Sequence, residues 1–215
     1  VNLPNGMQSL IFGGIFNESM ENVRLPAGLQ RLIFGYGFKQ SMEKVRLPSG
    51  LQKLVFGRYF DQSMSEVELP SCLQSLTLSG NANLRVEQAH LPNHLQSLTF
   101  ESFFNQSLEH VKLSSSLKNL TFGSGFNQPM DNVTLPSGLQ SLTFGAGFNQ
   151  CLDRVNLPSG LQSLAFGDHF NQKMENVQLP GGLQRLTFGS CFDQSVIVNL
   201  PCGLQSLSFG CCFNR

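Results

Sequence analysis

Hydrophobic and polar residues alternate in short stretches that recur along the whole chain at a fixed interval. Ten units follow one another, and they read approximately L-P-x-G-L-Q-x-L-x-F-G-x-x-F-N-Q-x-M-E-x-V-x. Each unit is 22 residues long, apart from the interval between Leu179 and Leu200, which is 21 because one residue is missing near Val196-Ile197-Val198. The units begin at Leu3, Leu25, Leu47, Leu69, Leu91, Leu113, Leu135, Leu157, Leu179 and Leu200. A constant interval of this kind predicts a solenoid, in which neighbouring units stack to bury a continuous core.

Two stretches in each unit have the alternation of a β-strand. In one unit they are Met130–Leu135 and Leu139–Phe144, separated by the turn-forming residues Pro136-Ser137-Gly138. We therefore expect two short strands in each coil, either of which can line the inner face. At most a single 3₁₀ turn is expected, near the Phe-Asn-Gln segment. The prediction is a mainly β solenoid with about ten coils, parallel stacked strands and little or no helix over residues 1–215.

Phenylalanine occupies two positions of the repeat almost exclusively. Of the 19 Phe residues, 18 lie in two columns, a column being the set of residues at one position in successive units. The first column comprises Phe12, Phe34, Phe56, Phe100, Phe122, Phe144, Phe166, Phe188 and Phe209. The second comprises Phe16, Phe38, Phe60, Phe104, Phe126, Phe148, Phe170, Phe192 and Phe213. We expect both columns to be interior stacks and not a platform for a sugar or a cofactor.

Asparagine and glycine also recur at fixed positions. We expect the Asn residues after the second Phe to be buried and to accept hydrogen bonds from the backbone of the next coil. These are Asn17, Asn105, Asn127, Asn149 and Asn171. We expect the glycines after the first Phe to adopt a backbone angle that other residues avoid. These are Gly35, Gly57, Gly123, Gly145 and Gly167.

The unit that runs from Leu135 through Pro136, Gly138 and Leu139 to Gln150 resembles the leucine-rich-repeat superfamily. More closely, it is similar to the FNIP-type repeats of slime moulds and to long repeat arrays of dinoflagellates and other protists. The resemblance covers essentially the whole chain and carries the signature L-P-x-x-L-x-x-L-x-F-G-x-x-F-N-Q. It implies a curved solenoid with a parallel sheet on its inner face, and it implies binding as the usual task.

The outward residues of the Leu-Gln-x-Leu-x-Phe stretch vary from unit to unit and form our candidate binding face. Its members are Arg31, Lys53, Ser75, Thr77, Ser97, Thr99, Thr121, Ser141, Thr143 and Arg185. The amino-terminal end of this face is basic and apolar, whereas its middle carries small hydroxyl side chains. The alternative is a solvated β-surface, on which threonine is favoured in any case. Rows of Ser and Thr also allow a further alternative, an ice-binding surface.

Charge is balanced overall, with 14 basic and 14 acidic residues, but it is uneven along the array. Residues 1–60 carry seven basic and three acidic side chains, and residues 61–110 carry one basic and six acidic. Electrostatic potentials of opposite sign at different places along the solenoid favour docking of a partner in one orientation. They also allow head-to-tail self-association. An acidic column also runs along the second stretch of each unit, and we expect it to be solvated. The column comprises Glu21, Glu43, Glu87, Glu109, Asp131, Asp153 and Glu175.

The fourth unit departs from the pattern. Leu78 and Ala82 replace both Phe residues, and Ser79 replaces glycine. These substitutions predict that the coil either leaves a void or pinches inward. Phe103, the one Phe outside the columns, lies one coil later and is a candidate to fill such a void.

Four of the six cysteines lie in the last two units. Cys191 and Cys212 share a position in adjacent coils, so their α-carbons are expected roughly 5 Å apart, within disulfide range. The alternative is free thiols in a reducing compartment.

No catalytic, cofactor-binding or metal-binding constellation is apparent, and we expect no catalytic, cofactor or metal residues. The chain begins at Val1 inside a repeat, so we expect it to belong to a longer protein. The predicted function is a non-catalytic protein-binding or scaffold module whose partner is another protein or a larger assembly, with no nucleic acid and no membrane insertion. Two alternatives stay open. One is an accessory structural subunit of a large complex, for example an organellar one, and the other is an extracellular adhesion or surface protein.

Overall fold

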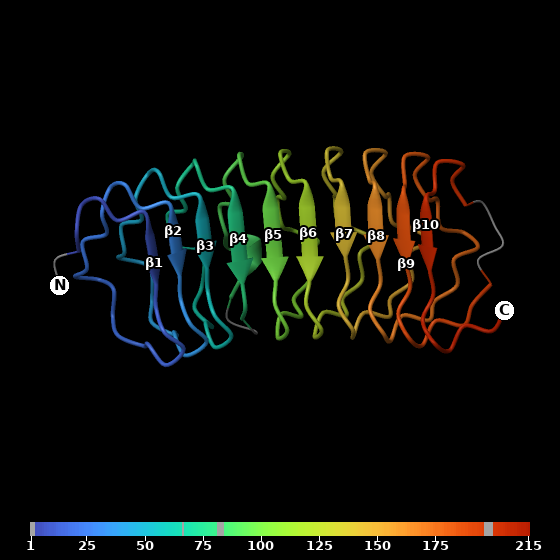
Figure 1. Cartoon of the computed structure of the whole chain (residues 1–215), viewed down its shortest axis with the longest axis horizontal. Coiled ribbons are helices and arrows are strands. Elements are labelled where there is room, and N and C mark those ends of the chain that lie inside the picture. The colour runs from blue at the N-terminus through green and yellow to red at the C-terminus, as the bar shows by residue number, and fades with distance from the viewer. Residues whose placement is uncertain (1–2, 66, 81–83, 196–199) are drawn as a thin grey trace.

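The computed structural model describes residues 3–65, 67–80, 84–195 and 200–215, and the predicted deletion near residues 196–198 lies outside them. Ten strands form one parallel sheet in chain order, β1 to β10 (Figure 1). The strands are β1 (Ser9–Ile11), β2 (Arg31–Ile33), β3 (Lys53–Val55), β4 (Ser75–Leu78), β5 (Ser97–Phe100), β6 (Asn119–Phe122), β7 (Ser141–Thr143), β8 (Ser163–Ala165), β9 (Arg185–Thr187) and β10 (Ser206–Ser208). Each strand is three or four residues of the Leu-Gln-x-Leu-x-Phe stretch.

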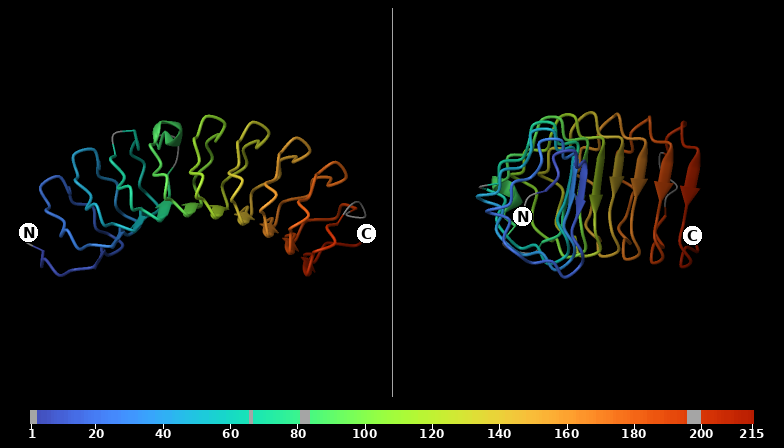
Figure 2. Two further views of the ribbon diagram at one scale, coloured as in Figure 1. Left: turned by 90° about the horizontal axis from the view of Figure 1, so that it is seen from above. Right: turned by 60° about the vertical axis from the view of Figure 1, so that its left-hand side comes forward.

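Register follows the repeat, so each position of one coil pairs with the same position of the next. Leu32 of β2, for example, pairs with Leu10 before it and Leu54 after it. The array is curved, and the strands lie on its inner side (Figure 2). Of the two stretches that alternation allowed, the Leu-Gln-x-Leu-x-Phe stretch therefore lines the concave face.

The second predicted strand is wrong. Within the described residues, the Met-x-x-Val stretch contributes no strand to the sheet, and in seven coils it instead forms a tight turn. The Val133 N–H donates to the carbonyl oxygen of Met130 at 3.0 Å, and Val155 and Leu152 make the same contact. Neighbouring coils splay apart on the convex side of the arc (Figure 2), so backbone hydrogen bonds there run mainly within a coil. The bond from the Met64 N–H to the carbonyl oxygen of Leu84, at 3.1 Å, is an exception that joins two coils.

One 3₁₀ helix, η1 (Val86–Gln88), is present in the described part of the chain. It lies in the fourth coil at the Met-Glu position of the repeat, not at the Phe-Asn-Gln segment where the sequence placed it. The preceding residue, Arg85, has a φ of 44°, in the left-handed region. This helical turn lies in the fourth coil, whose sequence departs from the repeat. It is therefore a local change of the backbone in that coil and not a feature of the repeat.

Both Phe columns are interior, as predicted. Phe144 and Phe148 stack within one coil with ring centroids 3.9 Å apart, and Phe144 stacks on Phe166 of the next coil at 5.7 Å. Twelve Phe side chains are among the largest fully buried residues. Each removes a large apolar area from water, so the ladder is the main source of cohesion between coils.

The void expected in the fourth coil is filled by a residue of that coil. Leu78 and Leu84 are both fully buried, whereas Phe103 is 41% exposed and leaves the interior. Leu84 therefore takes over the packing role that we had assigned to Phe103, and Ala82 lies outside the described residues. Ser79 in place of the usual glycine lowers the stability of the fold, because its hydroxyl group is buried with no hydrogen-bond partner among the described residues.

The recurring glycines are required for a different reason from the one we expected. No described glycine has a positive φ. Instead, a β-carbon on Gly145 would overlap the carbonyl group of Gly123 in the preceding coil. Close approach of two backbones, and not an unusual backbone angle, keeps this column small.

Candidate functional site

The candidate binding face lies on the concave side of the sheet, in two rows that run along the strands. In one row Arg31 pairs with Lys53 and then Ser75, and in the other Thr77 pairs with Thr99. Ser97, Thr121, Ser141, Thr143 and Arg185 occupy the corresponding positions of β5, β6, β7 and β9. Arg31 and Arg185 are exposed, whereas Lys53 and the Ser and Thr residues are half-buried. The structure brings the predicted residues onto one surface, and their role in binding stays a prediction.

The amino-terminal end of the concave face is its most apolar part. Ile11 of β1 is 63% exposed and is followed in the same row by Ile33 and Val55. From β4 onward the row is mostly threonine, with Ala165 on β8 and Ser208 on β10. The gradient that the sequence predicted is thus laid out along the inner face, with its apolar and basic end at β1 to β3.

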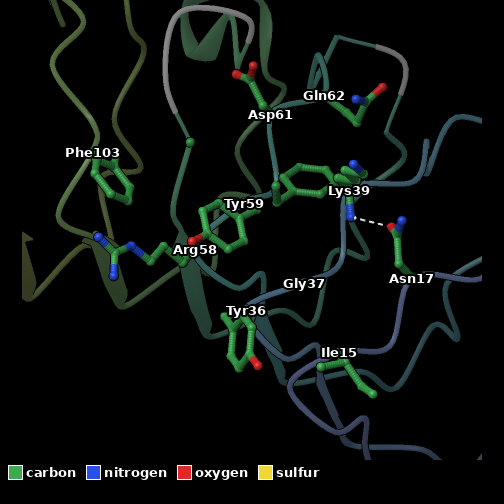
Figure 3. A pocket seen from close by; sticks show the side chains of 12 residues that line it. Ile15, Asn17, Tyr36, Gly37, Lys39, Arg58, Tyr59, Asp61, Gln62 and Phe103 are labelled. Carbon is green, nitrogen blue, oxygen red and sulfur yellow. Dashed lines mark hydrogen bonds between the residues drawn. The ribbon is translucent and has the colours of Figure 1, made fainter.

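Exposed hydrophobic residues gather in a groove next to this end. Six large hydrophobic residues are exposed in the described part of the chain, and four of them line one groove of about 810 Å³ (Figure 3). These four are Ile15, Tyr36, Tyr59 and Phe103. They include both tyrosines of the protein and its one Phe outside the columns. Monomeric proteins rarely concentrate exposed apolar side chains in this way without an interaction to make.

The repeat positions these side chains at the two residues that follow Phe-Gly, just past the end of each strand. The Gly37 N–H donates to the carbonyl oxygen of Gly14 at 2.6 Å, and the Tyr59 N–H donates to that of Tyr36 at 3.0 Å. The Tyr36 ring lies over Gly14, where a β-carbon would overlap it. Tyr36 and Tyr59 meet edge to face with centroids 6.2 Å apart. Backbone hydrogen bonds between coils therefore fix the spacing of the rings.

Arg58 closes the groove toward the fifth coil. Its guanidinium carbon lies 4.4 Å from the centroid of the Phe103 ring and 6.0 Å from that of Tyr59 (Figure 3). The fourth coil has Gly80 at the corresponding position, so no side chain separates Arg58 from Phe103. The small residue of the irregular coil thus allows a cation–π contact between coils three and five.

The charged residues around the groove are mainly basic. Lys39 and Arg58 line it together with one carboxylate, Asp61. Arg31 and Lys53 lie at the start of β2 and β3, whereas the groove lies past the ends of these strands. Neither of the two ion pairs among the described residues involves Lys39 or Arg58. Their positive charge is consequently available to a partner.

The asparagine ladder is confirmed, and it is interrupted at the groove. The side-chain oxygen of Asn149 accepts from the backbone N–H of Asn171 at 2.9 Å and from Gln172 at 3.0 Å. The same contact joins Asn17 to the backbone of Lys39, but Lys39 itself cannot accept one from the next coil. These residues are half-buried or exposed, not buried as expected. At the groove, the repeat position that elsewhere holds the ladder asparagine is therefore occupied by a basic residue, Lys39.

The acidic column is solvated, as predicted, and forms few contacts. Glu21 pairs with Lys44 at 3.1 Å, and the Glu21 carboxylate raises the pKa of Lys44 above its ordinary value by accepting a hydrogen bond and by its charge. The side chains are 48% and 70% exposed, so this pair adds little to stability. Within the described residues, no group of three or more His, Cys, Asp or Glu side chains has the arrangement of a metal site.

Comparison with known proteins identifies the repeat. A model of the FNIP repeat matches residues 38–81, 104–147, 126–169, 148–191 and 170–212, which together make up most of the chain. The chain belongs to the FNIP repeat family. Within this FNIP array, Ile15, Tyr36 and Phe103 lie outside the matched segments.

A solved structure has the same architecture. The crystal structure of CroV588, described as a novel circular LRR protein, is 34% identical with a TM-score of 0.60. The match covers 99% of the FNIP chain and 41% of the CroV588 chain, so the FNIP chain spans less than half of that protein. This likeness confirms the leucine-rich-repeat character of the solenoid. No curated protein matches the sequence.

The six cysteines of the FNIP array are exposed free thiols in the structure. Cys191 and Cys212 occupy the predicted neighbouring positions, and the Cys212 N–H donates to the carbonyl oxygen of Ser190 at 3.1 Å. The adjacent Cys211 thiol, by hydrogen bond and by charge, raises the pKa of Cys212. A bridge between Cys191 and Cys212 stays a prediction for an oxidising environment.

The groove was missed by sequence analysis, although a signal for it was present. In the repeat, the two residues after Phe-Gly are mostly small, as at Ser124 and Gly125, but they are Tyr36, Arg58 and Tyr59 in coils two and three. Large residues at repeat positions that are usually small were therefore the signal by which the sequence indicates the groove.

Proposed function

We propose that the chain is a non-catalytic protein-binding module that holds its partner at the amino-terminal end of the concave face and in the adjoining groove. The observation that carries the proposal is the clustering of Ile15, Tyr36, Tyr59 and Phe103 in one groove. Ile11, a fifth exposed hydrophobic residue, lies on β1 of the concave face at the same end of the array. Aromatic residues and arginine are the side chains that contribute most at protein interfaces.

The shape of the array supports the same proposal. A concave sheet presents its side chains to one partner from several coils at once, so many small contacts add up. Short parallel strands in fixed register hold these side chains rigidly, which limits the entropy lost on binding. The FNIP and leucine-rich-repeat relationships are consistent with an interaction surface.

Curvature argues against the ice-binding alternative. Ordered rows of Ser and Thr are present, but they lie on the inner side of an arc (Figure 2). A flat crystal lattice contacts a concave surface only at its ends, so successive hydroxyl rows cannot reach it together. The hydroxyl side chains are better suited to a partner with a convex surface.

The proposal is tested by native purification of the chain and two sets of variants from its natural source, followed by size-exclusion chromatography and mass identification. The Tyr36→Ala/Tyr59→Ala double variant removes the groove aromatics, and His169→Ala changes the residue that matches Tyr59 in the eighth coil. We expect a stoichiometric partner with the wild type and His169→Ala and its loss with the double variant. A lone species of 23.7 kDa for the wild type would contradict the proposal.

A further inference from the structure

The groove combines two kinds of surface that select different parts of one ligand. Its walls carry the exposed rings of Tyr36, Tyr59 and Phe103, and the side chain of Ile15 continues the same row toward the first coil (Figure 3). The volume of about 810 Å³ is large enough to receive a bulky side chain together with part of a backbone. The apolar walls therefore favour a ligand that inserts an aromatic or aliphatic group.

The surroundings of these rings carry positive charge that the chain does not neutralise. Lys39 and Arg58 stand on two sides of the groove (Figure 3). Neither belongs to either ion pair found among the described residues. A ligand with carboxylates on both sides of its apolar group would meet these cations directly.

The positive region is short, and this limits the kind of anion that fits. Residues 1–60 carry a net charge of +4, but residues 61–110 carry a net charge of −5. Asp61 already lines the far side of the groove, and Glu101 lies two residues before Phe103. A long polyanion such as single-stranded nucleic acid would be attracted at one end and repelled over the next coils. A short acidic segment fits within the basic region.

Building on the proposed protein-binding function, we propose that the partner is a polypeptide segment rich in Asp or Glu with a Phe, Tyr, Leu or Ile side chain at its centre. The central side chain packs in the groove against Tyr36 and Tyr59. Flanking carboxylates pair with Arg58 on one side and with Lys39 on the other. Arg58 is suited to this role because its contact with Phe103 holds the guanidinium in place without neutralising it.

The experiment is selection of random dodecamer peptides on the immobilised chain, run in parallel on wild type, Arg58→Ala/Tyr59→Ala and His169→Ala. We expect peptides enriched on wild type and on His169→Ala to be acidic with one central apolar residue. We expect the same peptides to be lost on the double variant. Circular dichroism of each variant checks the fold, and Arg58→Gln, which removes charge but keeps a long side chain, repeats the test if the double variant unfolds.

One enriched peptide then serves as a labelled probe in fluorescence anisotropy. Arg58→Gln is expected to weaken its binding by about tenfold, and added salt is expected to weaken it further. Groove-dependent peptides that are neutral or basic would overturn the acidic partner and leave the proposed function intact. No groove-dependent peptide at all would overturn the proposed function as well. Tighter binding of oligothymidylate than of the peptide would replace a protein partner with nucleic acid.

Discussion

At the residue scale, the distance between backbones in adjacent coils decides which side chains are tolerated. The glycine after the first Phe is the plainest case, because a single added carbon at Gly145 would overlap Gly123. The sequence predicts this glycine column correctly, but the expected cause, an unusual backbone angle, is wrong. Spacing between coils is a property of the stacked array, and no pattern within one unit reveals it.

Replacement of Gly145 by alanine should destabilise the array, whereas Gly181→Ala should not. Gly145→Ala is expected to lower the free energy of unfolding by about 1–3 kcal/mol, because two coils must separate to admit the methyl group. Gly181 has open space around a β-carbon, so its substitution should be neutral or should stabilise by up to about 1 kcal/mol. Urea denaturation measures both, and equal effects would show that close backbone approach is not the reason for the column.

Asp168 gives a pH-dependent prediction. The Ser190 hydroxyl donates to its carboxylate at 2.7 Å and the Ser190 N–H donates at 3.2 Å, which lowers the pKa of Asp168. A lowered pKa in the folded state stabilises above the ordinary pKa of aspartate, and this contribution is lost as pH falls through the folded value. Ser190→Ala should raise the pKa of Asp168 toward its usual value. An unchanged midpoint in a carbon-detected NMR titration would contradict this.

At the scale of the element, each coil consists of one short strand, tight turns and a ladder of side-chain hydrogen bonds. The strand was predictable because its alternation coincides with register between coils, as at Leu32 and Leu54. The same alternation at Met130 and Val133 produces a turn instead. Local periodicity cannot separate the two cases, because the difference is set by curvature, which brings coils together on one side only.

The stability of the asparagine ladder should depend on the side-chain oxygen that accepts a hydrogen bond, and not on the side-chain NH₂ group. Asn149→Ala leaves the backbone N–H of Asn171 without its partner and should lower the free energy of unfolding by about 1 kcal/mol. Asn149→Asp keeps an acceptor and should cost less, since Asp193 already accepts from the backbone of Asn214 at 3.0 Å. Thermal unfolding of the two variants decides this, and an equal loss would indicate that the donor NH₂ group matters.

Leu84 should be the residue that holds the fourth coil in place. Leu84→Ala removes a fully buried side chain and is expected to lower the free energy of unfolding by about 2–5 kcal/mol. Phe103→Ala changes a larger but partly exposed side chain and should cost less. The comparison is made by chemical denaturation. A greater loss for Phe103→Ala would restore the interpretation in which Phe103 fills the coil from outside.

At the scale of the whole molecule, a few residues that differ from the repeat create one distinct surface, the groove, in an otherwise regular array. Phe103 and Lys39 each replace a common residue, and together with the small Gly80 they open the groove and give it charge. The fold could be predicted almost completely from the sequence because ten units repeat the same constraints. The groove could not, because Ile15 and Phe103 are 88 residues apart and meet at one surface only after the coils stack.

Site-specific photo-crosslinking tests the central claim most directly. A benzoylphenylalanine is placed at position 59 in the groove or, as the matched control, at position 169, and the chain is irradiated in an extract of its natural source. The account predicts a discrete adduct with one polypeptide from position 59, attached within an acidic segment, and none from position 169. The same labelling from both positions, or none from position 59, would contradict a protein-binding groove at the amino-terminal end of the array.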